Sequence, residues 1–340
     1  MHNMSRSTIH DIAKALKITA STVSRALNGH PAISEVTRGA VLRMAQELNY
    51  EPNRIAAALR SGRTYTVGIL TPYVDRPFFG AAIRGIEDEL AKSGYGAILC
   101  QTHENPKDEQ RAIETLLRLR VDGIIASMAK NAVHHGHYER VTEAGIPLVF
   151  FDNVAEQMPV SMVMIDDYQG AYEAVRHLIE QGCQRIAHFA GQQHLRIYRE
   201  RLRGYLNAIA DHNLQHDDRL ILSCISDIEA GRQCAMQLFA LPQPPDAIFS
   251  SSDYAALGAL RHFKAIGIKV PEQMAIVGFA NEPFTDFIEP GLSSVDQCSS
   301  EMGTLAARIF LEAIQHQDAF VPRKNILQPN LVIRKSSLRR

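Results

Sequence analysis

The sequence predicts an α/β protein with a small all-α headpiece at its N-terminus, followed by two doubly wound lobes built on parallel sheets. Two observations predict this arrangement. Residues 8–48 carry apolar side chains at helical spacing, and from Thr66 onward short apolar runs alternate with amphipathic segments. Apolar runs without alternation indicate strands buried on both faces, as in parallel sheets with right-handed crossovers.

The segment from Thr8 to Asn28 predicts two short helices joined by a tight turn. Thr8 can cap a helix over residues 9–16, and Thr19 can cap a second helix over residues 20–28. Exposed positions of the second helix carry hydroxyl, amide and guanidinium groups, which are donors to phosphates and base edges. This layout is typical of a helix-turn-helix that reads the DNA major groove. Two surface helices of an ordinary domain are the alternative.

A third helix is expected over residues 35–48, with Ser34 as its cap. Pro52 ends that structure and can open a short alanine-rich helix from which Leu59 projects. A helix of this length forms only against a partner. A linker with some helical propensity is the alternative for residues 51–63.

Residues 64–340 are expected to form the two lobes. The predicted strands are 67–70, 97–100, 123–126 and 147–151, then a second set at 162–165, 185–189, 247–249 and 275–279. The predicted helices are 79–93, 108–118, one that ends at 144, 170–181 and 202–212. Two such lobes in tandem place a cleft between the carboxyl ends of their strands.

Aromatic and polar residues near the strand ends are expected to face this cleft. They are 77–79, 152–153, 199–201, 250–253 and 280–282. Aromatic rings cover the apolar face of a sugar and charged groups bind its hydroxyls, so this mixture suits a hydroxyl-rich ligand. Each residue also has a structural alternative: Asp152 as a helix cap, Arg201 as a partner of Glu200, and Phe79 as core.

Charge is distributed unevenly along the chain. Residues 1–63 contain nine Lys and Arg against four Asp and Glu, a balance of +5, whereas the whole chain carries −1 and the remainder therefore −6. A basic headpiece on an acidic body is typical of a protein that touches phosphate with one end only.

Other function classes lack their sequence signals. The chain has no dinucleotide-binding glycine motif, P-loop, nucleophile elbow or zinc-protease motif, so we expect neither an enzyme nor a cofactor. The five cysteines lack metal-ligand spacing, and His134, His135 and His137 are interpreted as a solvated loop rather than a metal site. Asp166 and Asp167 are expected to begin the helix near residue 170. The remaining rival is a sugar-binding or sugar-modifying protein with an incidental basic N-terminus.

The chain resembles the lactose-repressor (LacI) family of bacterial transcription regulators over nearly its whole length. The matching residues are 8–13, 21–28 and 49–53, with Ala56 and Leu59. The resemblance implies that residues 51–63 form a hinge helix, which pairs with its dimer mate in the minor groove and inserts Leu59 into the central base step. It also implies that the lobes are of the periplasmic-binding-protein type.

The expected DNA-binding residues follow from the helix faces and from the resemblance. Ser21 and Arg25 are expected to contact bases, and Ala20 offers a methyl group to thymine. The full expected set is Thr8, Thr19, Ala20, Ser21, Thr22, Ser24, Arg25, Asn28, Ser34, Asn53, Ala56 and Leu59.

The resemblance also implies how the chain builds the ligand site. It implies three crossings between the lobes, with lobe one at about 64–162 and 292–322 and lobe two at about 163–291 and 323–340. The expected effector-binding residues are Phe78, Phe79, Asp152, Arg201, Ser252, Asp253 and Asn281. Many family members carry an Asp where this chain has Ala280, which puts the transfer of any particular effector in doubt.

These inferences together predict a cytoplasmic, nucleoid-associated homodimer that regulates transcription, and we expect a repressor. Its partners would be a pseudo-palindromic double-stranded DNA operator and a small polar, sugar-related effector, with no membrane and no metal. A corepressor ligand or an activator is the milder alternative. The C-terminal tail shows no heptads, which favours a dimer over a tetramer.

Overall fold

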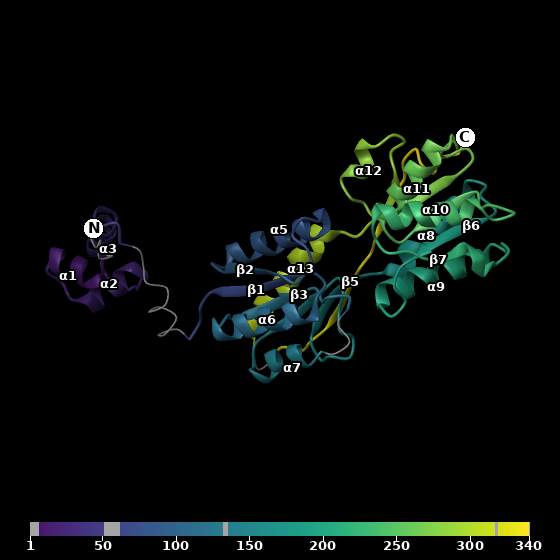
Figure 1. Ribbon diagram of the computed structural model, residues 1–340. Coiled ribbons are helices and arrows are strands. Elements are labelled where there is room, and N and C mark those ends of the chain that lie inside the picture. Colours follow the sequence, from purple (N-terminus) through teal and green to yellow (C-terminus); the bar gives the residue numbers. More distant parts are fainter. Residues whose placement is uncertain (1–6, 51–61, 132–134, 317–318, 340) are drawn as a thin grey trace. The chain divides into compact units, whose positions relative to one another are not determined.

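The protein divides into two compact units, residues 1–64 and 65–340. A computed structural model describes residues 7–50, 62–131, 135–316 and 319–339, and Figure 1 labels their elements. Each unit is described by itself below.

The first unit packs three helices around a small apolar core. They are α1 (Ile9–Leu16), α2 (Ala20–Leu27) and α3 (Glu35–Glu47). Ile12, Val23 and Val41, one from each helix, are fully buried against one another. The three helices confirm the sequence prediction to within one residue at each end, because every helix begins directly after a hydroxyl-bearing cap residue.

The first lobe of the second unit is an all-parallel sheet in the order β11-β5-β4-β3-β1-β2. Its strands are β1 (Thr66–Thr71), β2 (Gly96–Gln101), β3 (Gly123–Ala126), β4 (Leu148–Phe151), β5 (Ser161–Ile165) and β11 (Lys324–Leu327). Helices α5 (Pro77–Lys92) and α13 (Ser299–Gln315) cover one face, and α6 (Pro106–Arg118) and α7 (Gly136–Glu143) cover the other (Figure 1). The sheet is therefore buried on both faces, as its unbroken apolar strands predict.

The second lobe repeats this plan in the order β12-β10-β9-β8-β6-β7, in which only β12 runs antiparallel to its neighbour. Its strands are β6 (Ile186–Ala190), β7 (Ile221–Ser223), β8 (Ala247–Ser250), β9 (Ala275–Ala280), β10 (Ser293–Asp296) and β12 (Asn330–Val332). Its helices are α8 (Asp167–Glu180), α9 (Arg196–Asp211), α10 (Ile228–Phe239), α11 (Asp253–Ala265), the short α12 (Phe284–Phe287) and a 3-10 turn over Asp218–Leu220. Helices α8 and α9 cover one face of the sheet, whereas α10 and α11 cover the other.

The chain passes between the lobes three times, as the resemblance implied, but each crossing falls later than predicted. The strand at 162–165, expected to open the second lobe, pairs with β4 and β11 in the first sheet. Conversely, β10 belongs to the second sheet although its residues were assigned to the first lobe, and β11 belongs to the first although assigned to the second. An apolar run that is buried on both faces looks the same in either sheet, so its pattern does not assign it to a lobe.

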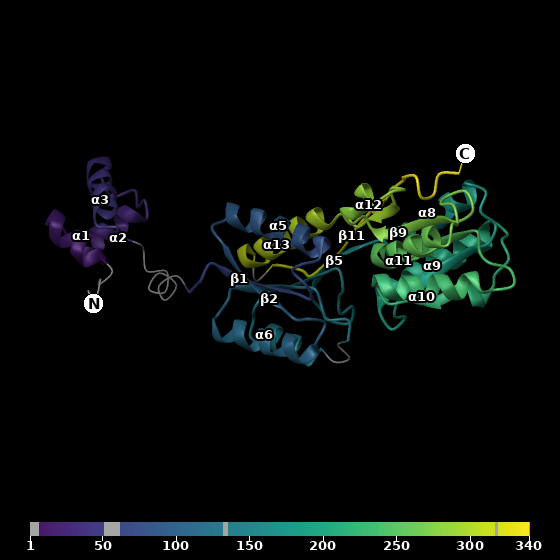
Figure 2. The ribbon, with the colours of Figure 1, turned by 45° about the horizontal axis from the view of Figure 1, so that its top comes forward.

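Helices α5 and α13 lie side by side and approach closely at two glycines (Figure 1; Figure 2). A Cβ added at Gly303 would lie 2.0 Å from the carbonyl oxygen of Ala82, and one at Gly85 would lie 2.2 Å from that of Ser300. Both of these contacts are with backbone atoms, which cannot move aside as the end of a flexible side chain can. The first lobe therefore depends on the absence of side chains at this helix crossing.

Replacing Gly303 with alanine is expected to lower the free energy of unfolding by at least about 1 kcal/mol, because the new methyl group forces the two helices apart. Urea denaturation of the full chain measures this. Gly80→Ala is the matched control: it also lies on α5, but an added Cβ there meets nothing within 4 Å. Equal stability of Gly303→Ala and Gly80→Ala would contradict the close approach.

Candidate functional site

In the first unit, one face of α2 is polar and does not pack into the apolar core of that unit. The side chain of Thr19 accepts from the N–H of Thr22 at 3.2 Å and caps α2. Val23 and Ala26 turn inward, whereas Ser21 and Arg25 are exposed. No hydrogen bond or ion pair joins the Arg25 guanidinium to another described residue, so its donors are available to an external acceptor.

Several of the other predicted DNA-binding residues hold the helices of this unit in place. Thr8 donates its hydroxyl and its N–H to Asp11 Oδ2, each at 2.8 Å, and these bonds lower the pKa of the Asp11 carboxyl. Asn28 Nδ2 donates to the Ser24 carbonyl at 2.8 Å, and Ser34 caps α3 by accepting from the Thr37 N–H. Ala20 and Thr22 are half-buried. Asn53, Ala56 and Leu59 lie outside the described residues.

The second unit contains a pocket between its two lobes, with a cavity volume of about 70 Å³. Six of the seven predicted effector-binding residues line it: Phe78, Phe79, Asp152, Arg201, Ser252 and Asp253. Ser251, Ala280 and Glu282, from the ranges expected to face the cleft, also line it. The sequence did not indicate the other lining residues, which are Arg76, Lys130, Ile197, Tyr198, Ser226, Tyr254, Phe279 and Gln297.

Arg201 is the most firmly held cation of the pocket, and it is 4% exposed. Its Nη2 lies 2.8 Å from Asp167 Oδ1, and its Nη1 donates to the Ser251 carbonyl at 2.9 Å. The guanidinium carbon stands 3.6 Å from the ring centroid of Phe279. These contacts fix the guanidinium plane against the floor of the pocket.

One sequence expectation about Arg201 is wrong, and so is the structural alternative that the sequence left open for it. It lies within α9 rather than in a loop before it, because that helix begins at Arg196. Its partner is not Glu200, which pairs with Arg203 at 2.6 Å. Its partner is Asp167, the first residue of α8, whereas Asp166 caps that helix as expected. Burial raises the pKa of the Asp167 carboxyl, and Arg201 and Arg196 oppose that shift.

Asp152 projects from the end of β4 in a left-handed backbone conformation, with φ of 60°. It caps no helix, because β4 is followed by a turn and then by β5. Its Oδ2 accepts from Ser127 Oγ at 3.4 Å. Desolvation raises the pKa of this carboxyl to about 6, and Lys130 and Arg201 oppose that shift.

Asp253 has a structural role at the edge of the pocket. Its Oδ1 accepts from Ser294 Oγ at 2.7 Å, and its Oδ2 accepts from the Glu282 N–H at 2.8 Å. A Cβ at Gly278 would lie 2.0 Å from Asp253 Oδ1, so this strand position requires glycine. Burial raises the pKa of the Asp253 carboxyl to about 6. The residue thus ties the start of α11 to β10 and to the loop after β9.

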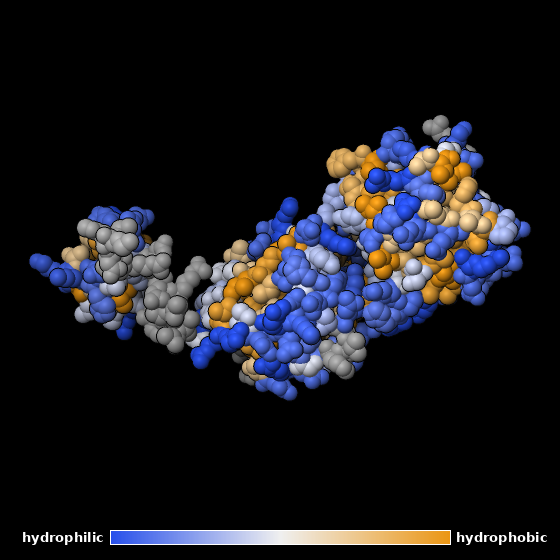
Figure 3. All heavy atoms as spheres, viewed as in Figure 1, coloured by the Kyte–Doolittle hydropathy of each residue, from blue (hydrophilic) through white to orange (hydrophobic). Residues whose placement is uncertain are grey.

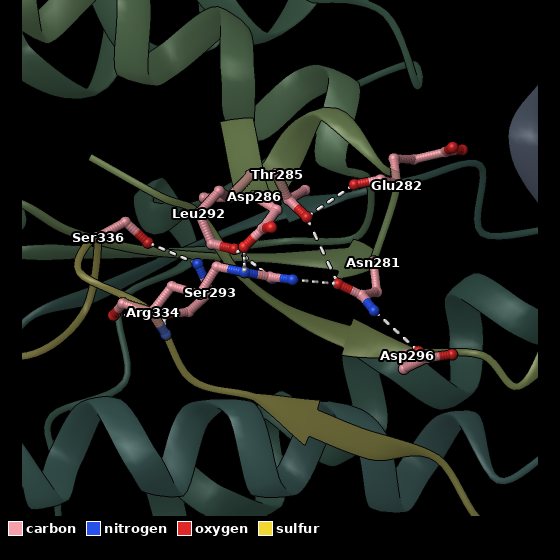
Figure 4. Close-up of polar contacts among 9 residues, drawn as sticks. All are labelled: Asn281, Glu282, Thr285, Asp286, Leu292, Ser293, Asp296, Arg334 and Ser336. Atoms are coloured by element: carbon pink, nitrogen blue, oxygen red, sulfur yellow. Dashed lines mark hydrogen bonds and ion pairs between the residues drawn. The ribbon is translucent and has the colours of Figure 1, made fainter. Parts of the chain in front are cut away.

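Asn281 is the predicted effector residue that the pocket does not include. Its Nδ2 donates to Asp296 Oδ2 at 2.8 Å, and its Oδ1 accepts from Arg334 Nη2 at 3.0 Å (Figure 4). Ala280 and Asn281 both have positive φ, at 126° and 50°. This turn sends the amide away from Glu282, which is the residue of this loop that enters the pocket.

His137 does not lie in a solvated loop as expected. It belongs to α7 and is half-buried, with its Nε2 2.7 Å from Glu109 Oε1. Among the described residues, no group of three or more His, Cys, Asp or Glu side chains is placed to hold a metal ion. Within the same ranges, no helix combines the length and apolarity that a membrane span requires.

Comparisons with known proteins match both units. Residues 64–335 match the family described as "Periplasmic binding proteins and sugar binding domain of LacI family", and residues 8–53 match "Bacterial regulatory proteins, lacI family". The transcriptional repressor CytR of Escherichia coli strain K12 is 32% identical over 310 residues, which cover 91% of this chain and 90% of CytR.

Solved structures agree with these matches. The transcriptional regulator CelR in complex with cellobiose is 30% identical with a TM-score of 0.73, over 97% of this chain and 100% of CelR. The lac repressor dimer bound to operator and an anti-inducer is 24% identical with a TM-score of 0.87, over 98% of this chain and 100% of that chain. The matches confirm the predicted fold class, and all three relatives are regulators rather than enzymes.

Proposed function

Because this chain belongs to the LacI family of bacterial transcription regulators, we propose that it binds a pseudo-palindromic operator as a homodimer and represses transcription. We further propose that a small polar ligand between its lobes controls this binding. The observation that carries the proposal is the pairing of two parts in one chain: a helix whose exposed face offers Ser21 and Arg25, and a two-lobed pocket lined by aromatic and charged groups. Such a regulator acts on the chromosome in the cytoplasm, and we expect it to associate with the nucleoid.

The homodimer is supported by an apolar edge strand on the first lobe. Strand β2 ends the sheet, and its Leu99 is 45% exposed. Figure 3 shows apolar side chains gathered on the first lobe where Figure 1 places β2 and α5. An apolar patch on a sheet edge is a site for subunit contact. The lac repressor, solved as a dimer on its operator, supports the same assembly.

A sugar or sugar derivative is the ligand class that the pocket favours. The rings of Phe79, Tyr198 and Phe279 can cover an apolar ring face, and the charged side chains can bind hydroxyl groups. CelR, which was solved with cellobiose, supports this class. Ligand and DNA binding are linked thermodynamically, so a ligand that changes DNA affinity must bind free and DNA-bound protein with different affinities. Calorimetric titration of both forms with a sugar that binds tests this coupling, and equal affinities would contradict it.

The expected insertion of Leu59 as a wedge into the central base step of the operator gives a separate prediction. Leu59→Ser should reduce both operator affinity and operator bending, because an inserted apolar side chain unstacks a base step and kinks the duplex at a cost of about a few kcal/mol. Gel phasing with a bound operator measures the bend. Val36→Ser, at an exposed position of α3, is the control for an apolar-to-hydroxyl change on the same unit. Equal bending by wild type and Leu59→Ser would rule out the wedge.

A further inference from the structure

One carboxylate of the pocket is buried without a partner for one of its oxygens. Glu282 is 5% exposed, and its Oε2 forms no hydrogen bond to any described residue. Its backbone is fixed: the N–H donates to Asp253 Oδ2 at 2.8 Å, and the carbonyl accepts from Thr285 Oγ1 at 2.7 Å. Figure 4 shows the carboxylate directed away from Asn281 and its polar cluster. The fixed backbone thus holds the side chain in the pocket, where the Oε2 atom still lacks a hydrogen-bond donor.

The surroundings of Glu282 disfavour its negative charge. Burial and the neighbouring Asp253 carboxylate raise the pKa of Glu282 to about 7, and Arg76 opposes that shift. The Arg76 guanidinium lies 4.9 Å and 5.4 Å from the ring centroids of Tyr73 and Tyr254. No ion pair within the described ranges joins Arg76 to Glu282. The carboxylate therefore has a cation in its vicinity but no direct ionic partner.

The charges of the whole pocket leave an excess of carboxylates. Two of its cations are already paired with carboxylates outside the lining, Arg201 with Asp167 at 2.8 Å and Lys130 with Glu104 at 3.6 Å. Of the three lining carboxylates, Asp152 is also influenced by Lys130 and Arg201, and Asp253 by Arg334, which leaves Arg76 as the cation that acts on Glu282. A buried charge without a partner carries a large desolvation penalty, which a ligand of opposite charge relieves.

We propose that Glu282 selects a ligand bearing a basic amine, namely an amino sugar, whose ammonium donates to Oε2. This inference rests on the proposed function of the pocket as a sugar site and adds the charge of the sugar. Ser251 Oγ, also buried without a hydrogen-bond partner among the described residues, is available to a sugar hydroxyl.

Calorimetry of the full chain tests the inference with matched probes. The probes are glucosamine, galactosamine and mannosamine, their neutral parents glucose, galactose and mannose, and the acids glucuronate and galacturonate. At least one amine is expected to bind about tenfold or more tightly than its neutral parent, since hydrogen bonds to a charged group are strong. Glu282→Gln should remove most of that preference, while Glu272→Gln, at an exposed position of the same lobe, should keep it.

A second measurement needs no ligand. At pH 8, Glu282→Gln should raise the melting temperature of the free protein by about 2 °C or more, because it removes an unpaired buried charge beside Asp253. A lower melting temperature would show that Glu282 stabilises the fold, which overturns the inference. Tighter binding of a neutral or acidic probe, or an amine preference unchanged in Glu282→Gln, would overturn it and leave the sugar pocket standing. Failure of every probe to bind would contradict the proposed sugar pocket and the inference with it.

Discussion

Replacing Arg201 with alanine is expected to abolish the response of DNA binding to ligand and to lower the free energy of unfolding by about 3–5 kcal/mol. The arginine is 4% exposed and lies 2.8 Å from the buried Asp167. Its removal leaves that carboxylate with Arg196, at 3.3 Å, as its one ion-pair partner among the described residues. Operator affinity of the folded variant should stay near the wild-type value, because the DNA-binding helices belong to the other compact unit. Urea denaturation and DNA titration with and without a binding sugar measure the two effects.

A double variant separates the structural role of this ion pair from its role in ligand binding. Arg201→Met combined with Asp167→Leu should recover much of the lost stability, because apolar residues of similar volume often replace a buried pair at little cost. It should not recover the ligand response, since the guanidinium is still absent. Arg203→Ala, an exposed position on the same helix, is the control. A double variant that responds to ligand like the wild type would show that Arg201 is purely structural.

Replacing Arg25 with alanine should weaken binding to the preferred DNA site by about 1–3 kcal/mol, roughly five- to 150-fold, and relax the preference at one base position. The residue is exposed on α2, and its guanidinium is not engaged by another described side chain. Arg43→Ala, on the exposed side of α3, removes the same charge from the same unit and should leave the base preference unchanged. Affinity titrations on site variants measure both effects. Retention of the wild-type preference by Arg25→Ala would refute the assignment.

Local features of the headpiece were predictable because its signals are local. Thr19 and Ser34 each cap the helix that follows, and the apolar spacing of Ile12 and Val23 identifies the buried faces. The same holds for the eight strands that apolar runs indicated, whereas β7, β10 and β11 were not predicted. Membership of β5 in the first sheet was not predictable, because pairing between distant strands leaves no mark on a uniformly apolar segment.

The sequence indicated which loops form the candidate site, but it did not indicate which side chains pair with one another there. Arg201 and Asp167 are 34 residues apart in sequence, and only the packing of α8 against α9 brings them together. The loop after β9 was identified, yet Asn281 was chosen from it where Glu282 enters the pocket. The positive φ values of Ala280 and Asn281 decide which side chain points inward. Such angles are uncommon for residues other than glycine, so they are hard to predict from sequence.

Selection of bound duplexes from random DNA by the full chain is a direct test of dimeric operator binding. We expect an enriched inverted repeat, bound by two chains per duplex, with enrichment lost when Arg25 is replaced by alanine. Salt should weaken binding steeply, because lysines and arginines of a basic headpiece displace counterions from phosphate. No enriched sequence, or a single half-site bound by one chain, would contradict a dimeric operator-binding regulator.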